Sequence, residues 1–127
     1  MKLTPMHYFV ILIVVVVGGI IGARAWSASQ PGQYDQFAQC LKDEGATFFG
    51  AFWCPHCQEQ KRLFGNSEKL LPYTECSLPD GKNQTQICID EEIKTYPTWE
   101  FKDGSRLMGV QSFEDLAEKT GCELNPV

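Results

Sequence analysis

An uninterrupted apolar segment near the start of the chain divides the sequence into two unequal parts. Tyr8–Ala23 reads YFVILIVVVVGGIIGA and contains no charged residue, with Lys2 before it and Arg24 after it. A helix of this length reaches about 24 Å, and counting back to Pro5 brings it close to the roughly 30 Å hydrocarbon core of a bilayer. This length and uniformity disfavour a buried core helix. We therefore expect residues 1–26 to be a membrane anchor or signal segment outside the folded domain.

Two interpretations of this segment remain open. A signal anchor keeps the rest of the chain tethered to the membrane, whereas a signal peptide would be cleaved near Ala23-Arg24-Ala25, an A-x-A-like site. The apolar run is long for the hydrophobic region of a signal peptide, which favours the anchor. Flanking charge says little about orientation, because Lys2 and the amino terminus face only Arg24.

The placement of the cysteines predicts the side of the membrane on which the rest of the chain lies. Six cysteines follow the apolar segment, and none lies before or within it. An even number of cysteines in a small exported domain is typical of disulfides formed in an oxidising compartment. We therefore expect the soluble domain on the extracytoplasmic side, in the periplasm or its equivalent.

The charge balance argues against one class of partner. The chain has 11 lysines and arginines against 16 acidic residues, a net charge of −5. The longest basic run is Lys61-Arg62. Nucleic-acid-binding domains usually carry a clustered basic surface, so we expect no nucleic acid partner.

The remainder of the chain predicts one α/β domain. Residues 27–32 (SASQPG) are small and polar and read as a linker, which leaves about 95 residues at 33–127 for one modest core. A βαβ unit followed by a helix, a hairpin and a last helix predicts a small mixed sheet flanked by helices. The predicted elements are a helix at Gln33–Glu44, a strand at Ala46–Trp53, a helix from Cys54 to about Phe64, a strand at Leu71–Cys76, a helix at Thr85–Ile93, strands at Thr98–Phe101 and Arg106–Val110, and a helix capped by Ser112 with Asp115 and ended by Gly121.

The stretch FWCPHCQEQK places two cysteines where the buried strand leads into a helix. First-turn amides carry partial positive charge, so we expect a lowered pKa for Cys54, the attacking sulfur. Cys57 lies one helical turn after Cys54. We expect its sulfur to be less exposed and to act as the resolving thiol. Pro55 restricts the backbone without costing a helical hydrogen bond, and protonated His56 adds positive charge beside Cys54. A stabilised thiolate makes the Cys54–Cys57 disulfide a strong oxidant.

Two other roles for this pair are disfavoured. A zinc site would need a second close pair, and the next cysteines, Cys76 and Cys88, do not form a second C-x-x-C. A purely structural Cys54–Cys57 bridge would close a very small loop and would restrain the unfolded chain little. We therefore expect a redox-active pair, with no metal and no bound cofactor.

A second candidate feature is Tyr96-Pro97-Thr98, just before the predicted hairpin. Pro97 is either a strand-entry residue or, with a cis peptide bond, part of a sharp loop whose free backbone groups pair with an extended substrate. Trp53 is either an ordinary core residue or a rim residue beside the reactive sulfur. We take these four residues as the candidate substrate-binding set.

These motifs together resemble the thioredoxin fold, and the Pro-His dipeptide is like that of the periplasmic oxidase DsbA. The stretches GAFWCPHCQEQKRLFG, YTECSLPDG and YPTWEFKDGSRLMG are similar to the thioredoxin-like domain that is fused to, or partners, bacterial homologues of vitamin K epoxide reductase. The resemblance covers about Gln33–Leu124. It implies that a quinone-linked membrane oxidase oxidises this domain, which then oxidises cysteines of exported proteins. We expect that four-helix partner to be a separate chain.

One departure from thioredoxins bears on the direction of the reaction. Thioredoxins have a buried Asp six residues before the first cysteine, and the residue here is Phe48. This difference weakens a reductase interpretation. Glu59 and Lys61 are further candidates for proton handling, although an exposed charged face explains both. The alternatives are a reductase or isomerase of the same fold, for example one serving cytochrome c maturation, and a non-catalytic binding module.

The resemblance also implies a structural disulfide. The extra disulfide of the family falls at Cys76 and Cys88, which flank the loop SLPDGKNQTQI. Cys40 and Cys122 then remain. They either pair with each other by default, stay free or contact the membrane partner.

Overall fold

The computed structural model describes residues 5–125 and separates the chain into two units, residues 1–30 and 31–127. The first unit contains the helix α1 (Pro5–Ser29). Its Pro5–Ser27 part is long and apolar enough to cross a membrane, by length and composition alone. At about 1.5 Å per residue the helix is longer than the roughly 30 Å core of a bilayer. A signal sequence near the N-terminus has the same properties, so α1 is compatible with both interpretations.

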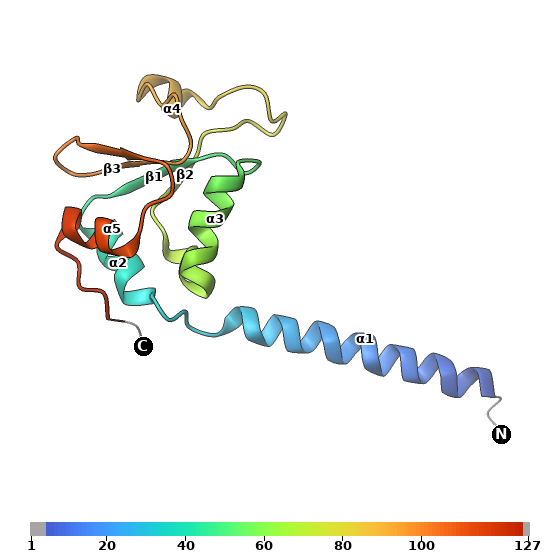
Figure 1. Cartoon of the computed structure of the whole chain (residues 1–127). Helices are drawn as coiled ribbons and strands as arrows, with labels where there is room; N and C mark the ends of the chain where they lie inside the picture. The colour runs from blue at the N-terminus through green and yellow to red at the C-terminus, as the bar shows by residue number, and fades with distance from the viewer. Residues whose placement is uncertain (1–4, 126–127) are drawn as a thin grey trace. The chain divides into compact units, whose positions relative to one another are not determined.

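The second unit is a four-stranded mixed sheet with helices on both faces (Figure 1). The strand order is β2-β1-β3-β4, with β1 parallel to β2 and antiparallel to β3, and β3 antiparallel to β4. The predicted thioredoxin-like fold is confirmed. The elements are α2 (Asp35–Asp43), β1 (Thr47–Gly50), α3 (Pro55–Phe64), the 3-10 helix η1 (Gly65–Leu70), β2 (Tyr73–Glu75), α4 (Gln86–Asp90), β3 (Thr98–Glu100), β4 (Arg106–Met108) and α5 (Phe113–Thr120).

Strand β1 is buried on both faces of the sheet. Phe48 stacks on Trp99 of β3, with ring centroids 4.8 Å apart, within the core under α2, α3 and α5. Phe49 points to the other face and packs with Cys76, Cys88 and Ile93. Figure 1 shows α4 on this side of the sheet, opposite α2, α3 and α5. Burial on both faces explains why the sequence of β1 is continuously apolar rather than alternating.

A buried glutamine fixes α3 against the rest of the domain. Gln60 is 0% exposed, and its Oε1 accepts hydrogen bonds from the Gln111 backbone amide at 2.7 Å and from Trp99 Nε1 at 3.3 Å. Its Nε2 donates to the Gln111 carbonyl oxygen at 3.2 Å. A buried amide is stable only when its polar atoms are paired in this way. The pairing therefore sets the position of α3 relative to β3 and to the segment before α5.

The predicted strand at Ala46–Trp53 is longer than β1, which ends at Gly50. Phe52 and Trp53 lie in the turn before α3 and are 49% and 48% exposed. The chain leaves the sheet after Gly50, because the pairing of β1 with β2 ends at Glu75. The Phe52 amide then donates a hydrogen bond to the Glu75 carboxylate at 3.1 Å.

The predicted ends of the last helix are confirmed. Ser112 is the N-cap residue of α5, and its Oγ accepts a hydrogen bond from the Asp115 amide at 3.1 Å. Gly121 ends the helix in the left-handed region with φ of 74°, where glycine is favoured.

Two disulfides cross-link the second unit. Cys40 of α2 is bonded to Cys122, which follows α5, across a sequence separation of 82 residues. Cys76, directly after β2, is bonded to Cys88 of α4 across a separation of 12 residues. The first joins distant parts of the chain, and the second closes a local loop.

Removing the longer-range disulfide should destabilise the domain more. For a separation of 82 residues the loss of loop-closure restraint predicts a cost of about 4.5 kcal/mol, and for 12 residues it predicts about 3 kcal/mol. Guanidinium unfolding of the Cys40→Ala/Cys122→Ala and Cys76→Ala/Cys88→Ala variants measures both costs. A larger loss in the second variant would contradict this order.

Candidate active site

Cys54 lies at the junction where β1 leads into α3. It is the N-cap residue of the helix, and Pro55 occupies the first turn. The Cys57 backbone amide donates a hydrogen bond to the Cys54 sulfur, with N and Sγ 3.4 Å apart. Helix N-termini present unpaired amides and partial positive charge, which stabilise bound anions. Cys54 lies at the helix start, as predicted, but three residues separate it from the end of β1.

Both cysteines of the pair are buried free thiols. Cys54 is 5% exposed and Cys57 is 1% exposed. Because Cys54 stands at the helix start, the sequence predicts that it is the exposed thiol of the pair. The structure corrects this prediction, because Cys54 is itself buried, although it is more accessible than Cys57. The cause is the loop before β3, because the Cys54 thiol donates to the Tyr96 carbonyl oxygen at 3.7 Å. This loop covers part of the sulfur that we expect to react.

Cys57 is held as a neutral thiol. Burial raises the pKa of its thiol to about 12, and the adjacent Cys54 thiol adds to the rise. The Ala51 backbone and the Lys61 ammonium act in the opposite direction. Because the thiolate is the attacking species, Cys57 is a weak nucleophile at neutral pH.

The surroundings of Cys57 include three groups from β1, β2 and α3. A Cβ atom on Gly50 would lie 2.9 Å from Cys57 Sγ and 2.9 Å from the Tyr73 ring, so only glycine leaves room for both. Lys61 Nζ lies 3.4 Å from the centroid of the same ring. The Tyr73 hydroxyl donates to Glu75 at 2.8 Å, and burial together with this carboxylate raises the pKa of Tyr73. Tyr73 therefore stays neutral beside the buried thiol.

Tyr73 and Glu75 were not among the site residues predicted from the sequence. Both lie on β2, well after the C-x-x-C in sequence, and parallel pairing with β1 brings them close. The predicted βαβ unit was the available signal, since its two strands are usually neighbours in the sheet. Phe48 pairs with Tyr73 in this register, and its ring lies 5.1 Å from the Tyr73 ring. The residue at position 48 therefore offers no proton acceptor to Cys57.

His56 is exposed and turned toward a carboxylate. Its Nδ1 lies 3.5 Å from Glu59 Oε2, and the two side chains are 70% and 52% exposed. Solvent screens this contact, because both side chains are exposed. The role predicted for His56, adding positive charge near Cys54, stays a prediction.

The four candidate substrate-binding residues lie in two different environments. Trp53 and Tyr96 are accessible, and their rings are in edge-to-face contact with centroids 6.0 Å apart. Pro97 and Thr98 are buried, and the Thr98 hydroxyl donates to the Thr95 carbonyl oxygen at 2.8 Å. The Tyr96–Pro97 peptide bond is cis. The two aromatic side chains are therefore the members of this set that a substrate can touch.

Cys57 should not ionise in the physiological range even when it is the single free thiol of the pair. In a Cys54→Ala variant the burial that raises its pKa remains. Thiolate absorbance should therefore stay flat between about pH 6 and pH 10, where an ordinary cysteine titrates near pH 8.5. An absorbance rise centred at that ordinary value would show that burial does not control this thiol.

Replacing His56 should make the Cys54–Cys57 disulfide less oxidising, because a positive charge near the helix start is lost. We expect His56→Ala to lower the reduction potential by about 30 mV, and we expect no decrease for Glu59→Gln, which removes a negative charge. Equilibration with glutathione measures both variants. Equal potentials in wild type and His56→Ala would remove His56 from the tuning of the pair.

Comparison with known proteins supports thiol chemistry at this site. The chain matches no protein-family model. It is 45% identical over 93 residues, 69% of its length, to the thiol-disulfide oxidoreductase LTO1 of Arabidopsis thaliana. The matched region spans 24% of that protein. The chain is thus similar to about a quarter of a larger thiol-disulfide oxidoreductase.

Proposed function

We propose that this chain is a membrane-anchored thiol-disulfide oxidoreductase that acts outside the cytoplasm as an oxidase. A substrate thiolate attacks Cys54 Sγ, the Cys54–Cys57 bond breaks, and Cys57 leaves and takes up a proton. A second substrate thiolate then attacks the substrate sulfur of the mixed disulfide and displaces Cys54. Two electrons and two protons pass to the protein, whose disulfide becomes two thiols, while the substrate gains a disulfide.

The burial of Cys57, which is 1% exposed and lies in the same core as Phe48 rather than beside a proton acceptor at that position, is the observation that supports the oxidase assignment. In the mixed disulfide, a return attack by Cys57 on Cys54 would release the substrate in its reduced form. That attack requires the Cys57 thiolate, which burial disfavours strongly. The second thiol of the substrate therefore competes well for the mixed disulfide. A reductase needs the opposite balance, with a base near Cys57, and Phe48 supplies none.

Lys61 supports the first step of this reaction. Cys57 must leave as a sulfur anion, and a leaving group of high pKa leaves slowly. The Lys61 charge lowers the pKa of Cys57, and the Tyr73 ring holds the ammonium at 3.4 Å from its centroid. This cation stabilises negative charge on Cys57 at the moment when the disulfide opens.

Features outside the reactive pair support the proposed location and partners. The helix α1 suits a membrane anchor, and the two structural disulfides suit an oxidising compartment. The proposed substrates are exported proteins that contain cysteines. The proposed oxidant of the reduced pair is a quinone-linked membrane oxidase of the vitamin K epoxide reductase type. The relative named above supports the reaction type, and the sequence resemblance supports the partner.

The reduction potential of the Cys54–Cys57 pair tests the direction. We expect the full chain in detergent to equilibrate with glutathione nearer to the value of DsbA, about −120 mV, than to that of thioredoxin, about −270 mV. The oxidised protein should also form disulfides in reduced, unfolded ribonuclease. A potential near the thioredoxin value would favour a reductase, and inertness toward glutathione would favour a binding module.

Trapping of mixed disulfides tests the roles of the two sulfurs and of the partner. In Cys57→Ala, the Cys54 thiolate can still attack a disulfide of the membrane oxidase or of an oxidised exported protein, which releases one thiol of that partner. The mixed disulfides should accumulate, because no Cys57 remains to attack Cys54 and displace the partner. Cys54→Ala is the matched control and should trap few. Non-reducing gels of membranes, with mass spectrometry of the trapped bands, measure both variants. Equal trapping would refute the assigned roles, and trapping of substrates without any membrane oxidase would remove the proposed route of re-oxidation.

A further inference from the structure

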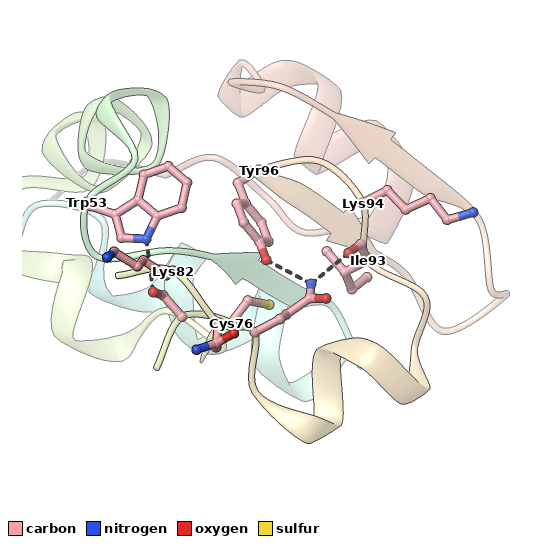
Figure 2. Close-up of a pocket in the computed structure, with 9 residues that line it drawn as sticks. Trp53, Cys76, Lys82, Ile93, Lys94 and Tyr96 are labelled. Atoms are coloured by element: carbon pink, nitrogen blue, oxygen red, sulfur yellow. Dashed lines mark hydrogen bonds between the residues drawn. The ribbon is translucent and has the colours of Figure 1, made fainter. Parts of the chain in front are cut away.

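A pocket of about 380 Å³ lies beside the candidate active site. One wall is Trp53, which directly precedes Cys54 in the chain. Another is Tyr96, whose carbonyl oxygen contacts the Cys54 sulfur at 3.7 Å. Figure 2 shows both rings at this pocket. A peptide whose cysteine meets Cys54 thus has its neighbouring side chains within reach of the pocket.

Hydrogen bonds hold both aromatic walls in place. Trp53 Nε1 donates to the Ser77 hydroxyl at 2.9 Å. Gln84 Nε2 donates to the Tyr96 hydroxyl oxygen at 2.8 Å and to the Ile93 carbonyl oxygen at 2.7 Å (Figure 2). The Tyr96 hydroxyl is an acceptor in this contact, so its own hydrogen is directed elsewhere. The pocket therefore offers the Tyr96 hydroxyl as a hydrogen-bond donor and two aromatic surfaces that are already held in place.

The charge of the pocket is opposite to that of the chain. Lys82 and Lys94 line it and no acidic residue does, although the chain carries a net charge of −5. Neither lysine takes part in the salt bridges found among residues 5–125. The Asp80 carboxylate accepts from the backbone amides of Lys82 and Asn83, at 2.9 and 3.0 Å. Outside the lining, the Glu75 carboxylate accepts a hydrogen bond from the Ser77 amide at 2.9 Å and acts on Tyr96. The charged side chains that line the pocket itself are both cationic, which suits a negatively charged ligand group.

The two lysines differ in how they meet the pocket. Lys82 follows Gly81, where an added Cβ would lie 3.8 Å from the Trp53 ring, so Lys82 belongs to the wall next to Trp53. The Lys94 side chain extends outward in Figure 2 and contributes to the rim. Lys82 is therefore the cation closest to the aromatic wall that adjoins Cys54.

We propose that this pocket binds an aspartate or glutamate side chain that lies next to the reactive cysteine of the substrate. Lys82 supplies the opposite charge, the Tyr96 hydroxyl donates a hydrogen bond to the carboxylate, and the Trp53 ring covers the methylene groups. The inference rests on the proposed function, since it assumes that a substrate cysteine bonds to Cys54. It adds a substrate class, exported proteins with an acidic residue beside the cysteine that is oxidised.

Disulfide exchange with three matched peptides tests this inference. The peptides carry the same pair of cysteines and differ in one flanking residue, which is Glu, Gln or Lys. The oxidised full chain in detergent is mixed with each reduced peptide, and the second-order rate constant is measured by acid quenching and chromatography. We expect the Glu peptide to react about two- to fivefold faster than the Gln peptide, the range for a partly exposed ion pair, and the Lys peptide to react more slowly.

Charge-reversal variants show whether the preference among the peptides comes from the pocket. The other possible causes are the net charge of the protein and a change in the reactivity of the peptide thiol. Lys82→Glu should reverse the ratio of the Glu and Lys rates. Lys102→Glu, the same charge change at a lysine that lines a different pocket, should leave the ratio unchanged. Tyr96→Phe removes the hydroxyl donor while keeping the ring, and it should reduce the preference for Glu over Gln.

The outcomes distinguish this inference from the function on which it rests. Exchange with all three peptides at ratios that Lys82→Glu does not alter would overturn the acidic pocket and leave the oxidase intact. The same shift in Lys82→Glu and Lys102→Glu would also overturn it, because it would assign the preference to net charge. No exchange with any peptide would overturn the proposed function and this inference together.

Discussion

The burial of β1 between two hydrophobic layers fixes the place of the reactive sulfur. Phe48 packs against Trp99 on one face, and Phe49 packs against Cys76 and Ile93 on the other. A slip by one residue would exchange the two faces, so the register of this strand is strongly specified. The chain must then leave the sheet after Gly50. With α3 held by its buried glutamine, the N-terminus of that helix meets the end of the strand.

The same burial makes the two cysteines of the pair chemically different. Cys54 sits at the N-cap, where its sulfur accepts a helix amide. Cys57 lies one turn inside, close to Gly50 and the Tyr73 ring, where burial raises its pKa to about 12. The two thiols are three residues apart and have different surroundings. Cys54 lies at the N-terminus of the helix, and Cys57 is packed in the core. The proposed direction of electron transfer depends on this difference.

Features of the fold and of the site that depend on neighbours along the chain could be predicted from the sequence. The N-cap Ser112, the terminating Gly121 and the position of Cys54 at a helix start are set within a few residues, so their patterns were sufficient. The contacts of Tyr73 and Glu75 depend on strand pairing, and the sequence pattern carries no direct record of such pairing. The exposure of Trp53 was left open for the same reason, because it depends on where pairing with β2 stops.

The disulfide between Cys76 and Cys88 connects stability with recognition. It joins the end of β2 to α4. A hydrogen bond also closes the loop between these two elements, because the Thr85 amide donates to the Cys76 carbonyl oxygen at 2.8 Å. Ser77 and Gln84 face each other across this closed loop. These two residues hold the Trp53 and Tyr96 rings beside the reactive sulfur. This cross-link thereby fixes the surface that we propose meets the substrate.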